Sequence, residues 1–361
     1  MKIRPFALER FFAKHEFSVK HLGCASDPDS LTTREVLALE PGAEAKFLEL
    51  GLGYGESVGQ PELRSAIAAL FTGIAPEDTL VHAGAEEAIF ACMNVLLGPG
   101  DHVIVHTPAY QSLYEVAESA GASVTRWEAR EKDGWQPDVE ALERMLKPET
   151  KLVVINSPHN PTGALISRDR LDAIVAFARK HGLWLFGDEV YRGVEYGAPR
   201  NPSVVELYER GISVGATAKV YGLAGLRIGW LVCRDRSLLE RVATFKDYLT
   251  ICSPGPSEFL AAIALRHTEV LATRTRKIVE ANLPLVQQLI TERPDQFSWV
   301  RPVAGTTGFM RYVPGGAEKW TREVLARSGL LFLPGPLFDF SDTHFRIGLG
   351  RSALVTWLPL L

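Results

Sequence analysis

The stretch KLVVINSPHNPTGALISRDRLDAIVAFARKHGLWLFGD, residues 151–188, decides the fold. It opens with an apolar run at Lys151–Asn156, passes through a turn rich in Asn, Pro and Gly, and continues with helical spacing over Arg168–Lys180. A second apolar run, Leu183–Asp188, follows. Apolar runs that alternate with amphipathic helices predict βαβ units and a mostly parallel sheet. The stretch therefore predicts an α/β fold.

The same alternation extends to both sides of this stretch. It predicts helices at Pro61–Phe71, Glu86–Leu97, Gln111–Ala120 and Asp138–Leu146, and strands at His102–His106, Ser123–Trp127, Ile212–Gly215 and Arg227–Val232. Beyond about Arg236 a long helical tract through Ile290 replaces the alternation, and short strands follow near Phe309–Val313 and Phe345–Gly348. We interpret this change as a domain boundary. We expect an N-terminal arm and part of the small domain at 1–48, a large domain at 49–240 and a small C-terminal domain at 241–361.

The composition excludes several classes of protein. Of the 361 residues, 46% are hydrophobic and 23% are charged, which is typical of a globular protein and not of a disordered or fibrous one. The net charge of −4 gives no basic field for nucleic acid or anionic lipid, so we expect neither as a partner. The N-terminal segment MKIRPFALERFFAKHEF interrupts each apolar stretch with a charge, which predicts neither a signal peptide nor a spanning segment.

The four cysteines indicate the compartment. Cys24, Cys92, Cys233 and Cys252 lie far apart, without a C-x-x-C pair or clustered histidines, so we expect no metal site. Interpreted as reduced thiols, they suit a cytoplasmic protein.

A single lysine stands in the glycine-rich segment VGATAKVYGLAGLRIGW, residues 214–230. The segment lies between two apolar runs, which places Lys219 on a turn at the edge of the sheet. Arg227 follows in the same segment, and the glycines around it allow the backbone to turn so that both cations face one pocket. A lysine amine at such a place can condense with an aldehyde. A solvated loop lysine is the plainer interpretation.

Polar side chains also follow the predicted strands at their carboxyl ends. Asp188 ends an apolar run, Tyr191 follows it in DEVYRG, and Asn160 lies in NSPHNPTG, residues 156–163. Open α/β sheets bind ligands at this edge, where a carboxylate can keep a pyridine nitrogen protonated and a phenol or an amide can bind a ring oxygen. A helix N-cap is an equally good interpretation of Asp188, and a tight turn is one of the Asn160 segment.

Two further segments fit a phosphate and a planar ring. HAGAEEAIF, residues 82–90, runs from a strand into a helix, and Gly84 and Ala85 leave the first helical amides open to a phosphate. Tyr110 in TPAY can stack on a flat cofactor, although packing explains both segments equally well. GLGYGES, residues 51–57, lacks the full G-x-G-x-x-G pattern and a preceding strand, which argues against a nicotinamide cofactor.

Together these motifs resemble the fold type I, class I and II aminotransferase family, whose members use pyridoxal 5′-phosphate (PLP). The resemblance runs from about Tyr54 to Arg346 and lies in the order of the residues. The matching positions are Tyr54 upstream of GQPELR, the turn Gly84, Ala85 and Glu86, then Tyr110, Asn160 in NPTG, Asp188 and Tyr191 in DEVY, Lys219, Arg227 in GLRIGW and Arg346 in FRIGLG.

The resemblance implies a mostly parallel seven-stranded sheet with flanking helices, plus a smaller α+β C-terminal domain. It implies a PLP Schiff base on Lys219, with Asp188 and Tyr191 as the other catalytic residues. The implied cofactor contacts are Tyr54, Gly84, Ala85, Glu86, Tyr110, Asn160, Asp188, Tyr191, Thr217, Lys219 and Arg227. Arg346 and Asn160 would bind the substrate, Arg346 through its α-carboxylate. The family often has S-F-S-K where this chain has Ala216, Thr217, Ala218 and Lys219, so the contact of Thr217 with phosphate stays open.

The implied reaction is exchange of the amino group between an α-amino acid and a 2-oxo acid, with the Lys219 amine moving the Cα proton. A PLP lyase or cyclase is the alternative, because the shared cofactor residues do not decide which Cα chemistry follows. LERFF, residues 8–12, and KDYLT, residues 246–250, look similar to capreomycidine synthase, which cyclises an arginine derivative. An effector-binding module without turnover is disfavoured, because the first 50 residues contain no basic helix-turn-helix.

The resemblance also implies a homodimer with composite sites, since the residue matched by Tyr54 reaches the phosphate of the neighbouring subunit. The phenylalanines between Phe6 and Phe17 favour the same assembly, because an exposed aromatic stripe is a liability that a partner would bury. Packing of this arm on its own small domain is the alternative.

Overall fold

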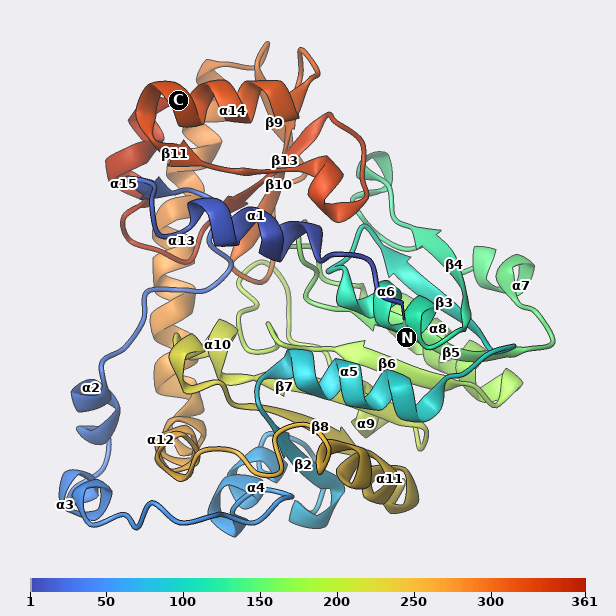
Figure 1. Cartoon of the computed structure of the whole chain (residues 1–361). Coiled ribbons are helices and arrows are strands. Elements are labelled where there is room, and N and C mark those ends of the chain that lie inside the picture. Colours follow the sequence, from blue (N-terminus) through green and yellow to red (C-terminus); the bar gives the residue numbers. More distant parts are fainter. Residues whose placement is uncertain (1) are drawn as a thin grey trace.

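In the computed structural model, which describes residues 2–361, seven strands form the large sheet in the order β2-β8-β7-β6-β5-β3-β4 (Figure 1). Neighbours from β4 to β7 pair in parallel, and β8 runs antiparallel to both β7 and β2. This confirms the expected mostly parallel seven-stranded sheet. The strands are β2 (Thr79–His82), β3 (His102–Thr107), β4 (Ser123–Glu128), β5 (Thr150–Asn156), β6 (Trp184–Asp188), β7 (Gly211–Ala216) and β8 (Gly229–Cys233).

The strands of this sheet are buried on both faces. Val103 and Val105 of β3 belong to one hydrophobic core, and Ile104 between them belongs to the other. Val154 and Val153 of β5 divide in the same way. Successive side chains of a strand point to opposite faces, so two helical layers bury the inner strands on both sides, whereas the edge strand β4 is only partly buried. Burial on both sides explains why the strands are continuous apolar runs in the sequence.

Helices cover both faces (Figure 1). One core takes side chains from α5 (Ala85–Leu96), α6 (Ser112–Ser119) and α11 (Arg236–Lys246), and the other from α2 (Thr33–Leu37), α3 (Ala43–Leu48), α4 (Pro61–Ala68), α7 (Ala141–Met145), α8 (Arg168–His181), α9 (Val204–Leu207) and α12 (Gly255–Arg266). The ends of α8 follow from local chemistry. Its last turn carries Arg179, Lys180 and His181, which suit the negative end of the helix dipole, and Gly182 ends it in the left-handed conformation.

A four-stranded antiparallel sheet forms the smaller part of the molecule, in the order β12-β13-β10-β9. Its strands are β9 (Phe297–Trp299), β10 (Thr307–Tyr312), β12 (Leu333–Pro334) and β13 (His344–Gly348), with α14 (Ala317–Ser328) and α15 (Leu354–Trp357) nearby. The long helix α13 (Thr268–Glu292) connects it to the large sheet (Figure 1). We propose domain limits near residues 48 and 240 on this layout.

The N-terminal arm packs on its own chain. Helix α1 (Ala7–His15) lies between the two parts, and β1 (His21–Leu22) pairs with β11 (Leu330–Leu331) (Figure 1). Three of the four arm phenylalanines are half-buried against residues such as Trp135 and Phe338, whereas Phe17 is 95% exposed. The stripe is therefore not evidence for a partner, contrary to the expectation from the sequence. Within residues 2–361, no helix has the length and hydropathy needed to cross a membrane.

Gly229 of β8 determines how closely this strand approaches the turn before α5. A Cβ at Gly229 would sit against the backbone of Gly84 and 2.5 Å from the amide nitrogen of Ala85. Backbone atoms on both sides leave no flexible side chain to move away. We expect Gly229→Ala to lower the free energy of unfolding by about 1–3 kcal/mol. Urea denaturation measures this, with Gly225→Ala as the control, because nothing lies within 4 Å of a Cβ there. Equal stability of the two variants would contradict the close approach.

Candidate active site

A cavity of about 500 Å³ lies at the carboxyl edge of the large sheet, where the N-terminal arm and β13 close over it. Nine of the predicted site residues line it: Ala85, Glu86, Tyr110, Asn160, Asp188, Tyr191, Lys219, Arg227 and Arg346. Residues from distant parts of the sequence thus meet in one cavity. Gly84 lies next to Arg227, which lines the cavity. Thr217 and Tyr54 are not among the lining residues.

Lys219 lies on α10 (Thr217–Val220), a single turn that begins where β7 ends. Its Nζ donates a hydrogen bond to Ser26 Oγ at 2.7 Å. Thr306 Oγ1 donates in turn to the Ser26 carbonyl oxygen, which fixes this part of the arm. The amine therefore meets the arm inside the cavity. The Thr217 hydroxyl points elsewhere, since it donates to the carbonyl oxygens of Leu223 and Ile228.

Asp188 ends β6 with its carboxylate directed into the cavity. The residue is 5% exposed, and its one recorded side-chain hydrogen bond comes from the Val190 amide at 3.3 Å. Among residues 2–361 no arginine or lysine lies within ion-pair distance of it. Burial raises the pKa of Asp188 to about 7, although the positive charge of Lys219 opposes the rise. A buried carboxylate with so few partners is suited to a ligand that carries a positive charge or donates a proton.

The backbone around Asp188 is held by its neighbours. Asn156 of β5 donates through Nδ2 to the Asp188 carbonyl oxygen at 2.9 Å and accepts through Oδ1 from the Asn160 amide at 2.7 Å. One amide side chain thereby ties the Asn160 turn to the end of β6. Tyr191 is 2% exposed and its hydroxyl has no hydrogen-bond partner among the described residues. An unpaired buried hydroxyl beside a cavity is suited to a polar ligand atom.

Arg227 and the N-terminus of α5 form a positive end of the cavity. Gly84 precedes α5 with a φ of 84°, and a Cβ there would lie 2.5 Å from Arg227 Nη2. Glycine therefore allows both the left-handed turn and the close approach of the guanidinium. Arg227 has no acidic partner within ion-pair distance in the described chain. Its charge and the open helical amides together suit a phosphate.

Tyr110 and Glu86 lie on the α5 side of the same cavity. The Tyr110 hydroxyl donates to Glu9 of the arm at 3.4 Å, and its ring packs on Phe6 with a centroid distance of 4.9 Å. Ser112 Oγ lies 2.7 Å from both carboxylate oxygens of Glu86. Burial raises the pKa of Glu86, which favours its neutral form and reduces its repulsion of an anion nearby.

Arg346 of β13 is a buried cation without a buried anion. It is 2% exposed, and its guanidinium donates to Asn160 Oδ1 at 3.0 Å and to the carbonyl oxygen of Cys24 at 2.9 Å. No carboxylate of residues 2–361 pairs with it. A buried charge is costly unless it is paired, so this position is suited to an anionic ligand.

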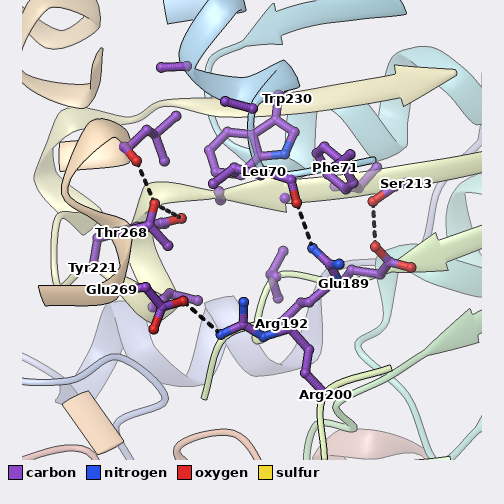
Figure 2. A pocket seen from close by; sticks show the side chains of 18 of the residues that line it. Leu70, Phe71, Glu189, Arg192, Arg200, Ser213, Tyr221, Trp230, Thr268 and Glu269 are labelled. Atoms are coloured by element: carbon purple, nitrogen blue, oxygen red, sulfur yellow. Dashed lines mark hydrogen bonds and ion pairs between the residues drawn. The ribbon is translucent and has the colours of Figure 1, made fainter. Parts of the chain in front are cut away.

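A second cavity, of about 440 Å³, shares Val190 and Ala216 with the first. Figure 2 shows that Glu189, Arg192 and Arg200 each form a hydrogen bond or an ion pair within the protein. Glu189 accepts from Ser213 Oγ at 2.7 Å, and Arg192 donates to the Leu70 carbonyl oxygen at 3.2 Å. Glu189 also accepts from the Val204 amide, so it anchors the chain next to Asp188 to β7 and α9. We infer that this network holds the backbone next to Asp188 in place and so supports the first cavity.

The residues that the arm contributes to the first cavity were not predicted from the sequence. Ser26, Asp27, Glu9 and Glu16 all line it. The acids alternate with phenylalanines in an amphipathic segment, a pattern that predicts a helix and gives no sign of what its faces contact. Pairing of β1 with β11, far along the chain, brings this segment over the cavity.

The cavity fits PLP. It provides a buried carboxylate for the pyridine nitrogen, an orphaned phenol for the ring oxygen, an unpaired guanidinium beside a helix N-terminus for the phosphate, and a lysine amine for the aldehyde. Among the described residues no group of three or more His, Cys, Asp or Glu side chains is arranged to hold a metal ion.

Comparisons with known proteins agree with this geometry. The family model for aminotransferase class I and II matches residues 25–356. The capreomycidine synthase of Streptomyces vinaceus is 31% identical over 345 residues, which cover 94% of this chain and 88% of that enzyme. The aspartate aminotransferase of Thermotoga maritima is 28% identical over 322 residues, covering 87% and 82% of the two chains. The crystal structure of a PLP-dependent aminotransferase from Streptococcus suis is 34% identical and superposes with a TM-score of 0.94 over 100% of this chain and 97% of that one.

We expect Asp188→Asn to stabilise the cofactor-free protein. The raised pKa means that the folded state binds the proton more tightly than the unfolded state, so the wild-type protein loses stability as pH rises from about 4 to about 7. The amide of the variant carries no such charge. The difference in free energy of unfolding between the variant and the wild-type protein should therefore grow over this range, towards an upper limit of about 4 kcal/mol. Urea denaturation at several pH values measures it. Asp172→Asn, which removes an exposed ion pair with Arg168, is the control. Parallel pH profiles for wild type and Asp188→Asn would contradict the expectation.

Proposed function

Because the chain belongs to the class I and II aminotransferase family and is a PLP-dependent aminotransferase, we propose that Lys219 carries the cofactor and that this cavity performs the exchange between an α-amino acid and a 2-oxo acid. The observation that carries this proposal is the burial of Arg346, without a carboxylate partner, in the cavity that also holds the Lys219 amine. An amino acid needs both groups. Its α-carboxylate pairs with a guanidinium, and its amino group must reach the position of the lysine amine.

When bound, PLP supplies an aldehyde for the Lys219 amine or the substrate amine and a ring that withdraws electrons from the substrate Cα. Asp188 keeps the ring nitrogen protonated, and Tyr191 and Asn160 donate to the ring oxygen. Arg227 and the first amides of α5 bind the phosphate, with Gly84, Ala85 and Glu86 forming its turn. Tyr110 packs against the ring. Thr217 is not assigned a phosphate contact, because its hydroxyl and its backbone amide both donate to carbonyl oxygens of the protein.

The chain's own residues then orient the substrate and move its proton. Arg346, supported by Asn160, binds both oxygens of the α-carboxylate and so fixes the Cα beside Lys219. The Lys219 amine takes the Cα proton and returns it as general base and acid. Ser26 Oγ, 2.7 Å from Nζ, steadies the amine while it is free. Burial of Asp188 and Arg346 strengthens their interaction with charge in the cavity.

A PLP-dependent lyase or cyclase is the second candidate. The match to capreomycidine synthase covers 94% of the chain and favours it, since the same lysine and carboxylate serve several reactions at the substrate Cα. A panel of amino donors, followed by the absorbance of the cofactor and by product analysis, separates the candidates. Exchange yields a 2-oxo acid and the aminated cofactor. Elimination or cyclisation leaves the aldehyde form, and a donor panel without any spectral change would contradict both.

Our proposed assembly is a twofold dimer. Tyr54 is 92% exposed, which leaves it free to reach a neighbouring subunit. It is one of six exposed apolar side chains on two segments of the chain, which are Leu48, Leu52, Tyr54, Tyr248, Leu249 and Ile251. Lys246 ties the second segment to Ser57, because its Nζ donates to the carbonyl oxygens of both Ser57 and Ile251. Exposed apolar side chains of this kind suit burial by a second copy. We also propose a cytoplasmic location, which suits the four free thiols.

We expect borohydride reduction of the holoenzyme to leave a phosphopyridoxyl group on Lys219 alone, which peptide mass spectrometry detects. Lys219→Ala should abolish turnover, because it removes both the carrier amine and the base. Lys277→Met is the control, since this exposed lysine of α13 lies outside the cavity. An adduct on another lysine would reassign the cofactor site.

The composite site is tested by mixing Tyr54→Phe subunits with Lys219→Ala subunits. If Tyr54 acts across the interface, the mixed dimer has one site damaged at both positions and one intact site. Activity should then rise above that of the two separate homodimers. Mass spectrometry of differently tagged subunits confirms that they exchange. Exchange without recovery of activity would remove the case for a shared site.

A further inference from the structure

We propose that the substrate side chain carries a positive charge, a guanidinium or an ammonium group, and that Glu16 and Glu9 of the N-terminal arm bind it. The proposal rests on the proposed function and adds the substrate class. The cavity itself does not rest on these acids, since Lys219, the orphaned Tyr191 hydroxyl and the unpaired Arg346 define it as a ligand site. The acids decide only which side chain it accepts.

The fixed groups direct the side chain towards the arm. With the α-carboxylate on Arg346 and the amino group at Lys219, the third substituent of the Cα extends to the remaining wall. Ser26, which touches Lys219 Nζ, belongs to that wall, so the arm begins directly beside the reacting atoms. The arm lines the cavity with both apolar and acidic side chains and with no lysine or arginine.

The combination of apolar and acidic side chains on this wall suits a long cationic side chain. Phe6, Leu8 and Phe12 offer apolar surface for methylene groups, and Glu9 and Glu16 provide carboxylates for a charged end. Side chains of the lysine and arginine type have this same division, with an apolar stem and a charged tip. An acidic side chain would meet repulsion here, and a short apolar one would leave the acids without a partner.

The fold does not account for Glu16. It is the C-cap residue of α1, where the helix dipole disfavours a negative charge. Its side chain is half-buried, and no hydrogen bond or ion pair to it is present in the described chain. Burial and the nearby charges of Asp27 and Glu9 raise its pKa, although the more distant charges of Arg351 and Lys219, which form no ion pair with it, act in the opposite direction. An acid kept in an unfavourable position beside two others is explained by a cation that it binds.

The neighbouring acids differ in what else they do. Asp27 forms an ion pair with Arg351 at 2.9 Å, so its charge is already balanced within the protein. Glu9 accepts a hydrogen bond from the Tyr110 hydroxyl. It also lies in the first turn of α1, where an acid stabilises the helix. Glu16 is therefore the principal residue for the incoming cation, and Glu9 adds to it.

The experiment compares two unreactive acids on the holoenzyme. 5-Guanidinopentanoate and 5-ureidopentanoate have the same length and the same carboxylate, but only the first has a charged end. Neither has an α-amino group, so neither can enter the reaction. Isothermal titration calorimetry should show that the wild-type enzyme binds the guanidino compound at least roughly tenfold more tightly. In the double variant Glu9→Gln/Glu16→Gln, the ratio of the dissociation constants of the two acids should fall towards one.

Glu280→Gln, on the exposed face of α13, is the matched control and should keep the wild-type preference. An unchanged absorbance spectrum of the bound cofactor shows that the double variant is folded around it. Equal affinity of the two acids for the wild-type enzyme would overturn the proposal, as would an unaltered preference in the double variant or no binding of either acid. Because these acids do not react, the result is separate from the donor panel. A failure of transamination appears only in the panel, and a failure of charge recognition appears only here.

Discussion

The burial of the Asp188 carboxylate without a cation is the constraint on which the rest of the site depends. An ionised carboxylate in such a place is costly, and its raised pKa expresses that cost. The surrounding structure keeps the group there nevertheless. Asn156 holds its carbonyl oxygen, and Glu189 anchors the next residue to β7 and α9. A ligand group that carries a positive charge or donates a proton to Asp188 would recover the stability lost there, so the fold itself favours such a ligand.

Charge is arranged in the same way elsewhere in the cavity. Arg346 and Arg227 are cations without acidic partners, and each lies where an anionic group of the substrate or cofactor would complete it. The second cavity is the opposite case, because hydrogen bonds or ion pairs within the protein satisfy Glu189, Arg192 and Arg200 (Figure 2). Two cavities of similar size therefore differ in what they can bind. The difference lies in which charges are left without partners.

The sequence pattern was sufficient to predict six of the seven strands of the large sheet, all but β2, and many of the residues that line the cavity. Strands buried on both faces are continuous apolar runs, and the carboxyl ends of parallel strands meet at one edge, so Asp188 and Asn160 could be placed together. The long helical tract was less accurate, since it is three helices, α11, α12 and α13. The contact of Ser26 with Lys219 depends on tertiary packing and has no signal in local spacing. The same is true of Glu16 and of the arm phenylalanines, which pack on the chain itself.

The hydrogen bond that Arg346 donates to the Cys24 carbonyl oxygen joins residues separated by 322 positions in the sequence. Synthesis on the ribosome delivers the arm long before β13, so this end of the cavity is absent until β13 has been made. The large sheet, made of residues 79–233, can form earlier. A nascent chain with its sheet folded would already present Asp188 and Lys219 while the arm was still undocked. An open half-site would thus precede the complete cavity, which forms only when the arm and β13 meet.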